Sequence, residues 1–89
     1  MQRYRIDMFT TYILQSEKTG KYYIGYTSNI KNRLQKHNAW SNISTRSGIP
    51  WKIVKMEQFN ARKEAWLRER QIKSYKGGEA FKKLLEESE

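Results

Sequence analysis

Two short runs rich in β-branched and aromatic residues lie close together in the first third of the chain and limit what it can fold into. They are Thr11–Gln15 and Lys21–Thr27, and the segment between them, Ser-Glu-Lys-Thr-Gly, ends in Gly20. Runs of this kind joined by a short turn with glycine are typical of a β-hairpin. The sequence therefore predicts an antiparallel strand pair as the first unit of the fold.

The following segments predict three helices and one more strand. Thr27 or Ser28 can cap the first helix and Asn60 the second, while Gly77 and Gly78 end the second. The third strand carries apolar residues on both faces, which indicates that it is covered on two sides. In chain order the predicted elements are a helix from Asn29 to about Trp40, a loop Ser41–Pro50, a strand Trp51–Phe59, a helix Ala61–Tyr75 and a helix Glu79–Glu87.

The element pattern predicts an α/β fold of the α+β type. A small, three-stranded, mostly antiparallel sheet is flanked by helices in the order β-β-α-β-α-α. The chain has 89 residues, enough for one domain and too few for two. We expect residues 1–89 to form one domain, with a core at about 10–76 and a closing helix at about 79–87.

The chain is strongly basic, with a net charge of +9. Residues 79–89 hold four acids and two bases, so residues 1–78 carry +11. A polyanion is therefore the first partner to consider, and nucleic acid is the commonest one.

Several classes of site are excluded by composition. The chain has no cysteine, and His37 is its only histidine, which excludes disulfides, thiolate chemistry and zinc sites built from cysteine. No apolar run approaches the ~18 residues of a membrane span, and the first ten residues lack the core of a signal peptide. We expect a cytoplasmic protein without a membrane partner.

Glu69 has two interpretations. It can be an exposed helical carboxylate paired with Lys73 at i+4, which is the commoner role of such a residue. Its position beside the apolar stripe of Ala65 and Ile72, among several bases, also suits a metal ligand at an anion-binding surface. A lone carboxylate with water and phosphate is a usual way to hold Mg²⁺ or Mn²⁺.

Arg33 and His37 lie four residues apart on the first predicted helix and share a neighbouring face. Taken alone, they are a solvated arginine and a hydrogen-bonded histidine. An arginine also matches the geometry of a phosphate and stabilises charge that develops on it. A histidine one turn later can orient a hydroxyl or accept its proton.

Strand alternation places Tyr23 and Gly25 on the same face of the hairpin. A glycine inside a strand leaves room for close approach of backbone or ligand, so Tyr23 faces a surface with space beside it. Tyr12 on the paired strand can share that face, depending on a register that the sequence leaves open. Tyr22 and Tyr26 are interpreted as residues of the sheet.

The joint spacing of these residues resembles the GIY-YIG nuclease superfamily, in particular its small standalone members, from about Thr10 to Lys76. The matching motifs are Tyr12-Ile13-Leu14, Tyr23-Ile24-Gly25, the segment from Asn29 to Asn38 with Arg33 and His37, Pro50-Trp51-Lys52-Ile53-Val54, and the segment from Glu64 to Lys73 with Glu69. One departure is that Thr10-Thr11-Tyr12 replaces the first motif, so its glycine and isoleucine are absent while its tyrosine is kept.

The resemblance implies a role for each matching residue. Tyr12 or Tyr23 would position and deprotonate the attacking water, and His37 would hydrogen-bond a tyrosine hydroxyl, with Tyr12 as the first candidate. Arg33 would bind the scissile phosphate. Glu69 would hold one divalent cation, Mg²⁺ or Mn²⁺, which offsets charge on the leaving oxygen.

A surface for the phosphate backbone would complete such a site, and tryptophans can stack on bases. For the three tryptophans of this chain we expect core packing of at least two. The basic residues predicted to bind nucleic acid are Lys31, Lys36, Arg46, Lys52, Arg62, Arg68, Arg70, Lys73 and Lys76.

Three functions compete at this point. The first is a metal-dependent endonuclease acting on DNA, directed by structure with weak sequence preference, in repair, recombination or defence, with a protein partner as a further source of specificity. The second is a non-catalytic nucleic-acid-binding module, and the third is a basic structural protein, for example one bound to the ribosome. The set of two tyrosines, Arg33, His37 and Glu69 favours the first, because a binding module needs no carboxylate among its bases.

Overall fold

A β-hairpin forms the first part of the fold, in a computed structural model that describes residues 8–87. Strand β1 covers Phe9–Ser16 and pairs antiparallel with β2, Tyr22–Thr27. Gly20 in the turn has a φ of +79°, a conformation that glycine adopts without strain. The register sets Tyr12 opposite Gly25, which answers the question that the sequence left open.

The third strand, β3, covers Trp51–Phe59 and pairs antiparallel with the other side of β1. The sheet order is therefore β2-β1-β3, with β1 in the middle. A register irregularity beside Ile13 and Leu14 shifts the β1–β3 pairing by one residue, as a β-bulge does.

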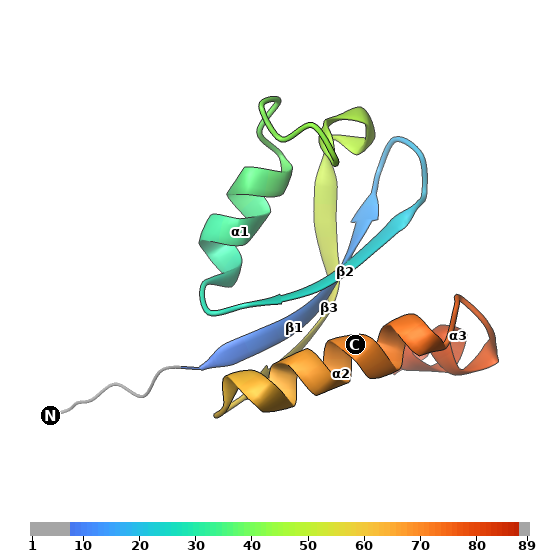
Figure 1. The fold of residues 1–89 in the computed structure, drawn as a ribbon. Helices are drawn as coiled ribbons and strands as arrows, with labels where there is room; N and C mark the ends of the chain where they lie inside the picture. The colour runs from blue at the N-terminus through green and yellow to red at the C-terminus, as the bar shows by residue number, and fades with distance from the viewer. Residues whose placement is uncertain (1–7, 88–89) are drawn as a thin grey trace, which may run out of the picture.

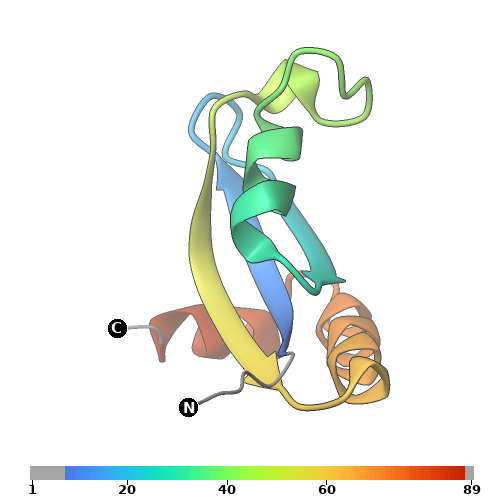
Figure 2. The same cartoon turned by 90° about the vertical axis from the view of Figure 1, so that its left-hand side faces the viewer.

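Helices cover both faces of the sheet (Figures 1 and 2). Helix α1, Ile30–His37, lies on one face, while α2, Arg62–Ser74, and α3, Glu79–Glu86, lie on the other. The element order β-β-α-β-α-α matches the predicted α+β architecture. Residues 1–7 and 88–89 lie outside the described part, so the extent of a single domain over 1–89 stays a prediction.

Each face of the sheet has its own hydrophobic core, because side chains alternate along β1. Tyr12 and Leu14 pack with Trp51 and with apolar residues of α1. Ile13, on the opposite face, packs with Ile72 of α2 and Phe81 of α3. Apolar residues of β3 join both cores, as predicted for a strand covered on two sides.

Helix ends differ from the predicted ones. Asn29, rather than Thr27 or Ser28, is the N-cap of α1, and its side chain accepts a hydrogen bond from the amide of Asn32. The helix ends at His37, three residues before Trp40, and a short 3₁₀ turn, Arg46–Gly48, lies inside the predicted loop. Ala61, not Asn60, occupies the cap position of α2.

Core packing of at least two tryptophans is contradicted. Only Trp51 is buried, whereas Trp40 is 70% exposed and Trp66 is 40% exposed. Trp40 lies beyond the end of α1, and Trp66 follows the buried Ala65 by one position and lines an open hollow instead of a core.

Candidate active site

Two tyrosines of the hairpin lie side by side on the face that α1 covers. The rings of Tyr12 and Tyr23 stack with centroids 6.4 Å apart and an angle of 16° between their planes. Gly25 makes this possible, since a Cβ atom there would lie 2.7 Å from the hydroxyl oxygen of Tyr12. The ring of Tyr12 therefore makes a close approach at Gly25.

His37 connects α1 to this tyrosine pair. Its Nε2 lies 3.1 Å from the hydroxyl oxygen of Tyr12, the hydrogen bond that we expected, and its ring centroid lies 4.4 Å from that of Tyr23. Burial, and then the charge of Arg33, lower the pKa of His37, so the ring is neutral at neutral pH. Its Nδ1 is buried and has no hydrogen-bond partner among residues 8–87.

Several of the predicted residues influence the pKa of the Tyr12 phenol. Burial raises its pKa to about 12, while hydrogen bonding and the charge of Arg33 act in the opposite direction. The charges of Tyr23 and Glu69 raise the same pKa. Arg33 of α1 and Glu69 of α2 therefore both act on one phenol, although they belong to helices far apart in sequence.

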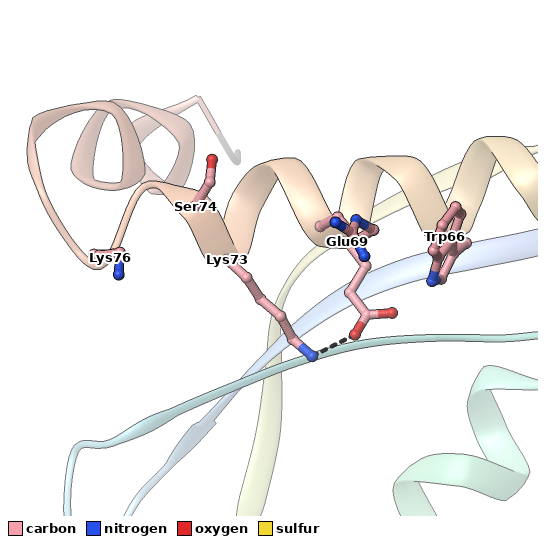
Figure 3. Close-up of a pocket in the computed structure, with 6 residues that line it drawn as sticks. Trp66, Glu69, Lys73, Ser74 and Lys76 are labelled. Atoms are coloured by element: carbon pink, nitrogen blue, oxygen red, sulfur yellow. Dashed lines mark ion pairs between the residues drawn. The ribbon is translucent and has the colours of Figure 1, made fainter.

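Glu69 lies at the edge of an open hollow on α2. Its side chain is 14% exposed, and one of its oxygens pairs with Lys73 Nζ at 2.5 Å, so the predicted i+4 ion pair is present (Figure 3). The hollow measures about 440 Å³ and is lined by Trp66, Glu69, Arg70, Lys73, Ser74 and Lys76.

A divalent cation fits the chemistry of Glu69. The carboxylate provides oxygen donors beside open space that water and a phosphate can fill, the arrangement that Mg²⁺ commonly uses. Within residues 8–87, no three His, Cys, Asp or Glu side chains gather into a metal-binding group. A cation at Glu69 would therefore depend on water and substrate for its remaining ligands.

Residues of the loop after α1 hold His37 and Trp51, which both contact Tyr23. The indole nitrogen of Trp51 donates to the carbonyl of Thr45 (2.7 Å), and the hydroxyl of Thr45 donates to the carbonyl of His37 (3.1 Å). The Trp51 ring meets Tyr23 edge-on at 6.5 Å. These supports were missed from the sequence, where a threonine inside a polar loop gives no signal.

The predicted basic residues divide into three sets. Arg70, Lys73 and Lys76 line the hollow of Glu69. Arg68 differs, because its guanidinium forms a two-pronged ion pair with Glu57 of β3 at 2.6 and 3.1 Å, which raises its pKa. The others are Arg62, which lines a second hollow, Arg46, which lies over the Trp40 ring, and the exposed Lys31, Lys36 and Lys52.

This chain belongs to the GIY-YIG family. Residues 8–82 match the model of the GIY-YIG catalytic domain. It is therefore a member of a nuclease family whose domains generally depend on a divalent metal.

Small proteins of the UPF0213 group are among its relatives. UPF0213 protein SH2523 of Staphylococcus haemolyticus is 33% identical over 70 residues, 78% of this chain and 85% of the relative. UPF0213 protein HQ_3675A of Haloquadratum walsbyi is 41% identical over 54 residues, and the match spans 60% of this chain and 61% of the relative's length. The solution NMR structure of UPF0213 protein BH0048 from Bacillus halodurans aligns with a TM-score of 0.46 and 29% identity, over 75% of this chain and 71% of that one.

Within residues 8–87, none of the helices has the length and apolar character needed to span a bilayer.

Proposed function

We propose that this protein is a metal-dependent endonuclease that hydrolyses phosphodiester bonds of DNA. The observation that carries the proposal is the cluster of Tyr12, Tyr23 and His37. Arg33 and Glu69 lie close enough to influence the pKa of the Tyr12 phenol. A binding surface for phosphates has no use for a buried tyrosine–histidine pair beside a carboxylate.

Arg33 is the group that would bind the scissile phosphate. An arginine guanidinium carries a positive charge and can donate two parallel hydrogen bonds to a phosphate. In the free protein Arg33 acts on the phenol of Tyr12, so this position lies next to the tyrosine pair. The positive charge of this guanidinium would then stabilise the negative charge that develops on the phosphoryl oxygens.

Tyr23 is the tyrosine that would meet the attacking water. It is 36% exposed, whereas Tyr12 is fully buried and has a pKa of about 12. We assign Tyr12, held by His37, to positioning. Tyr23→Phe should then abolish cleavage with binding retained, whereas Tyr12→Phe should lower the rate only in part; the reverse pattern would exchange the two roles.

Glu69 would hold the cation, Mg²⁺ or Mn²⁺, with its oxygens. When bound, the cation offsets negative charge on the leaving oxygen without a proton donor. Lys73 pairs with one carboxylate oxygen and would release that oxygen or share it with the cation.

A non-catalytic nucleic-acid-binding module is the second candidate function. The ion pair between Glu69 and Lys73 favours it, because a carboxylate satisfied by a lysine needs no metal. In the endonuclease, Glu69 holds a cation that cleavage requires. In the binding module, Glu69 only forms the ion pair with Lys73.

The deciding experiment incubates the protein with supercoiled plasmid and with flapped, branched, single-stranded and RNA substrates, in Mg²⁺ or Mn²⁺. We expect cleavage of at least one DNA substrate, with weak sequence preference, in keeping with a role in repair, recombination or defence. Arg33→Ala and Glu69→Ala should lower the rate by about 100-fold or more with binding retained. Binding to every substrate without cleavage of any would establish the binding module instead.

A further inference from the structure

Trp66 is an exposed indole that lies between two hollows on α2. On one side is the hollow of Glu69, which also holds Arg70 and Lys73. On the other is a hollow of about 450 Å³ lined by Tyr26, Arg62, Lys63 and Trp66. Figure 3 shows the side chains of Trp66 and Glu69 on the same side of the helix.

The charge of this surface suits a polyanion. Five basic side chains line the two hollows, against the single carboxylate of Glu69, which is itself paired with a lysine. Helix α2 has 13 residues and is therefore about 20 Å long. That length is enough for several consecutive phosphates of one nucleic-acid strand.

The indole itself is arranged for stacking. The guanidinium of Arg70 lies 5.0 Å from the centroid of the Trp66 ring, a cation–π contact that holds the ring in place. The residue is still 40% exposed, which leaves area for a second flat ring. An exposed tryptophan inside a basic track is the combination by which proteins bind single strands.

We propose that Trp66 stacks on an unpaired base, so that the face of α2 that carries Trp66 and Glu69 binds single-stranded nucleic acid. A paired base offers no free face, because both faces are covered by its neighbours in the duplex, so this contact selects a single strand, a flap or an opened base. The position of the scissile phosphate beside that base rests on the proposed function; the stacking does not.

The test measures binding without cleavage. Fluorescence anisotropy in EDTA compares a labelled single strand of 12 nucleotides, as DNA and as RNA, with a blunt duplex of two separate strands, which contains no unpaired loop. Trp66→Ala should weaken binding of the tighter single strand by roughly 5- to 150-fold, and duplex binding by less than about twofold. Trp66→Phe should restore most of the affinity, because it keeps an aromatic face.

Trp40→Ala is the matched control. Trp40 is also exposed and also carries an arginine over its ring, Arg46 at 5.3 Å, but it lies in the loop between α1 and β3. The variant Trp40→Ala should bind both the single strand and the duplex with the affinity of the unchanged protein. An unchanged melting temperature for Trp66→Ala shows that a lost contact, not unfolding, causes the effect.

Three outcomes would overturn the proposal. Equal losses on single strand and duplex would make Trp66 a general contact, and equal losses for Trp66→Phe and Trp66→Ala would exclude stacking. Unchanged affinity for both ligands would show that Trp66 does not contact nucleic acid. Selective loss in EDTA, together with no cleavage of any substrate in Mg²⁺, would retain the stacking site and reject the endonuclease.

Discussion

The position of the Tyr12 ring depends on the lack of a side chain at Gly25. A Cβ atom at Gly25 would lie 2.7 Å from the hydroxyl oxygen of Tyr12 and 2.9 Å from its Cζ atom. Tyr12 has no free direction in which to move, because it is fully buried and hydrogen-bonded to His37. The strand glycine thus fixes the position of the phenol on which the candidate site converges.

Gly25→Ala should therefore move Tyr12 and impair the site. We expect a loss of about 1–3 kcal/mol in the free energy of unfolding, typical of overpacking, and a cleavage rate at least tenfold lower. Gly20→Ala is the control: it strains a positive φ but meets nothing within 4 Å, so it should cost about 1 kcal/mol and leave cleavage unchanged. Equal activity of the two variants would contradict this account of Gly25.

His37 should make the stability depend on pH. Its pKa is lowered in the folded protein, whereas the unfolded chain binds a proton near pH ~6.5. Just below that pH the unfolded state holds more protons, so stability falls as pH drops, by at most about 1.4 kcal/mol per pH unit.

Urea unfolding at several values between pH 7.5 and 5 measures this effect. His37 is the only histidine of the chain, so His37→Gln should flatten the curve in this window while carboxylates remain ionised. A curve for His37→Gln as steep as that of the unchanged protein would show that another group is responsible.

At the scale of elements, β1 holds α2 in place through Thr11. The hydroxyl of this buried residue donates to the carbonyl of Ala65 at 2.8 Å. Ala65 lies one helical turn before Glu69, and its carbonyl is the acceptor for the Glu69 amide in a regular α-helix. Thr11 stands where the first family motif has isoleucine, so the departure from that motif creates a tie between the strand and the helix of the candidate metal ligand.

Thr11→Val should loosen this tie while keeping the shape of the side chain. We expect a loss of about 1 kcal/mol in the free energy of unfolding, the typical value of one hydrogen bond, and a cleavage rate several-fold lower. Thr11→Ser retains the hydroxyl and should keep both closer to the original values. Identical behaviour of the two variants would show that the hydrogen bond does not position α2.

The helices and strands could be predicted from the local pattern of apolar and polar residues, but the residues at which they begin and end could not. The alternating residues of β1 and β3 and the apolar stripe of α2 depend on periodicity alone. The N-cap of α1 falls on Asn29 because its backbone is extended there, with φ −149° and ψ 91°, and neighbouring capping residues give the same sequence signal. The register that sets Tyr12 opposite Gly25 could not be predicted from the sequence either.

For the whole molecule, the net charge predicts a polyanionic partner but not which bases bind it. Arg68 and Arg70 are two residues apart and identical in type, yet Arg68 pairs with Glu57 while Arg70 lines the hollow of Glu69. That division depends on how α2 packs against β3, which no local pattern contains. The convergence of Arg33 and Glu69 on Tyr12 likewise follows from tertiary packing, although family spacing pointed to the same residues.

The dependence of binding on salt should separate the two arginines. Arg70→Gln should reduce the slope of log K against log salt by about 0.7 on single strands, one phosphate contact. Arg68→Gln should leave that slope unchanged and instead lower the free energy of unfolding by about 1 kcal/mol, because it breaks a partly buried ion pair. Binding titrations between 50 and ~200 mM salt measure the slopes; equal reductions would place Arg68 in the binding surface.

The most direct test of the central claim is single-turnover cleavage of a flapped DNA by the unchanged protein and by Glu69→Gln, over a range of Mg²⁺ concentrations. Glu69→Gln keeps the size of the side chain and removes the charge that would hold the cation. The account predicts Mg²⁺-dependent cleavage that saturates for the unchanged protein and a rate about 100-fold lower or more for Glu69→Gln, with equal binding of the DNA in EDTA. Cleavage by Glu69→Gln at the same rate and the same Mg²⁺ dependence would contradict it.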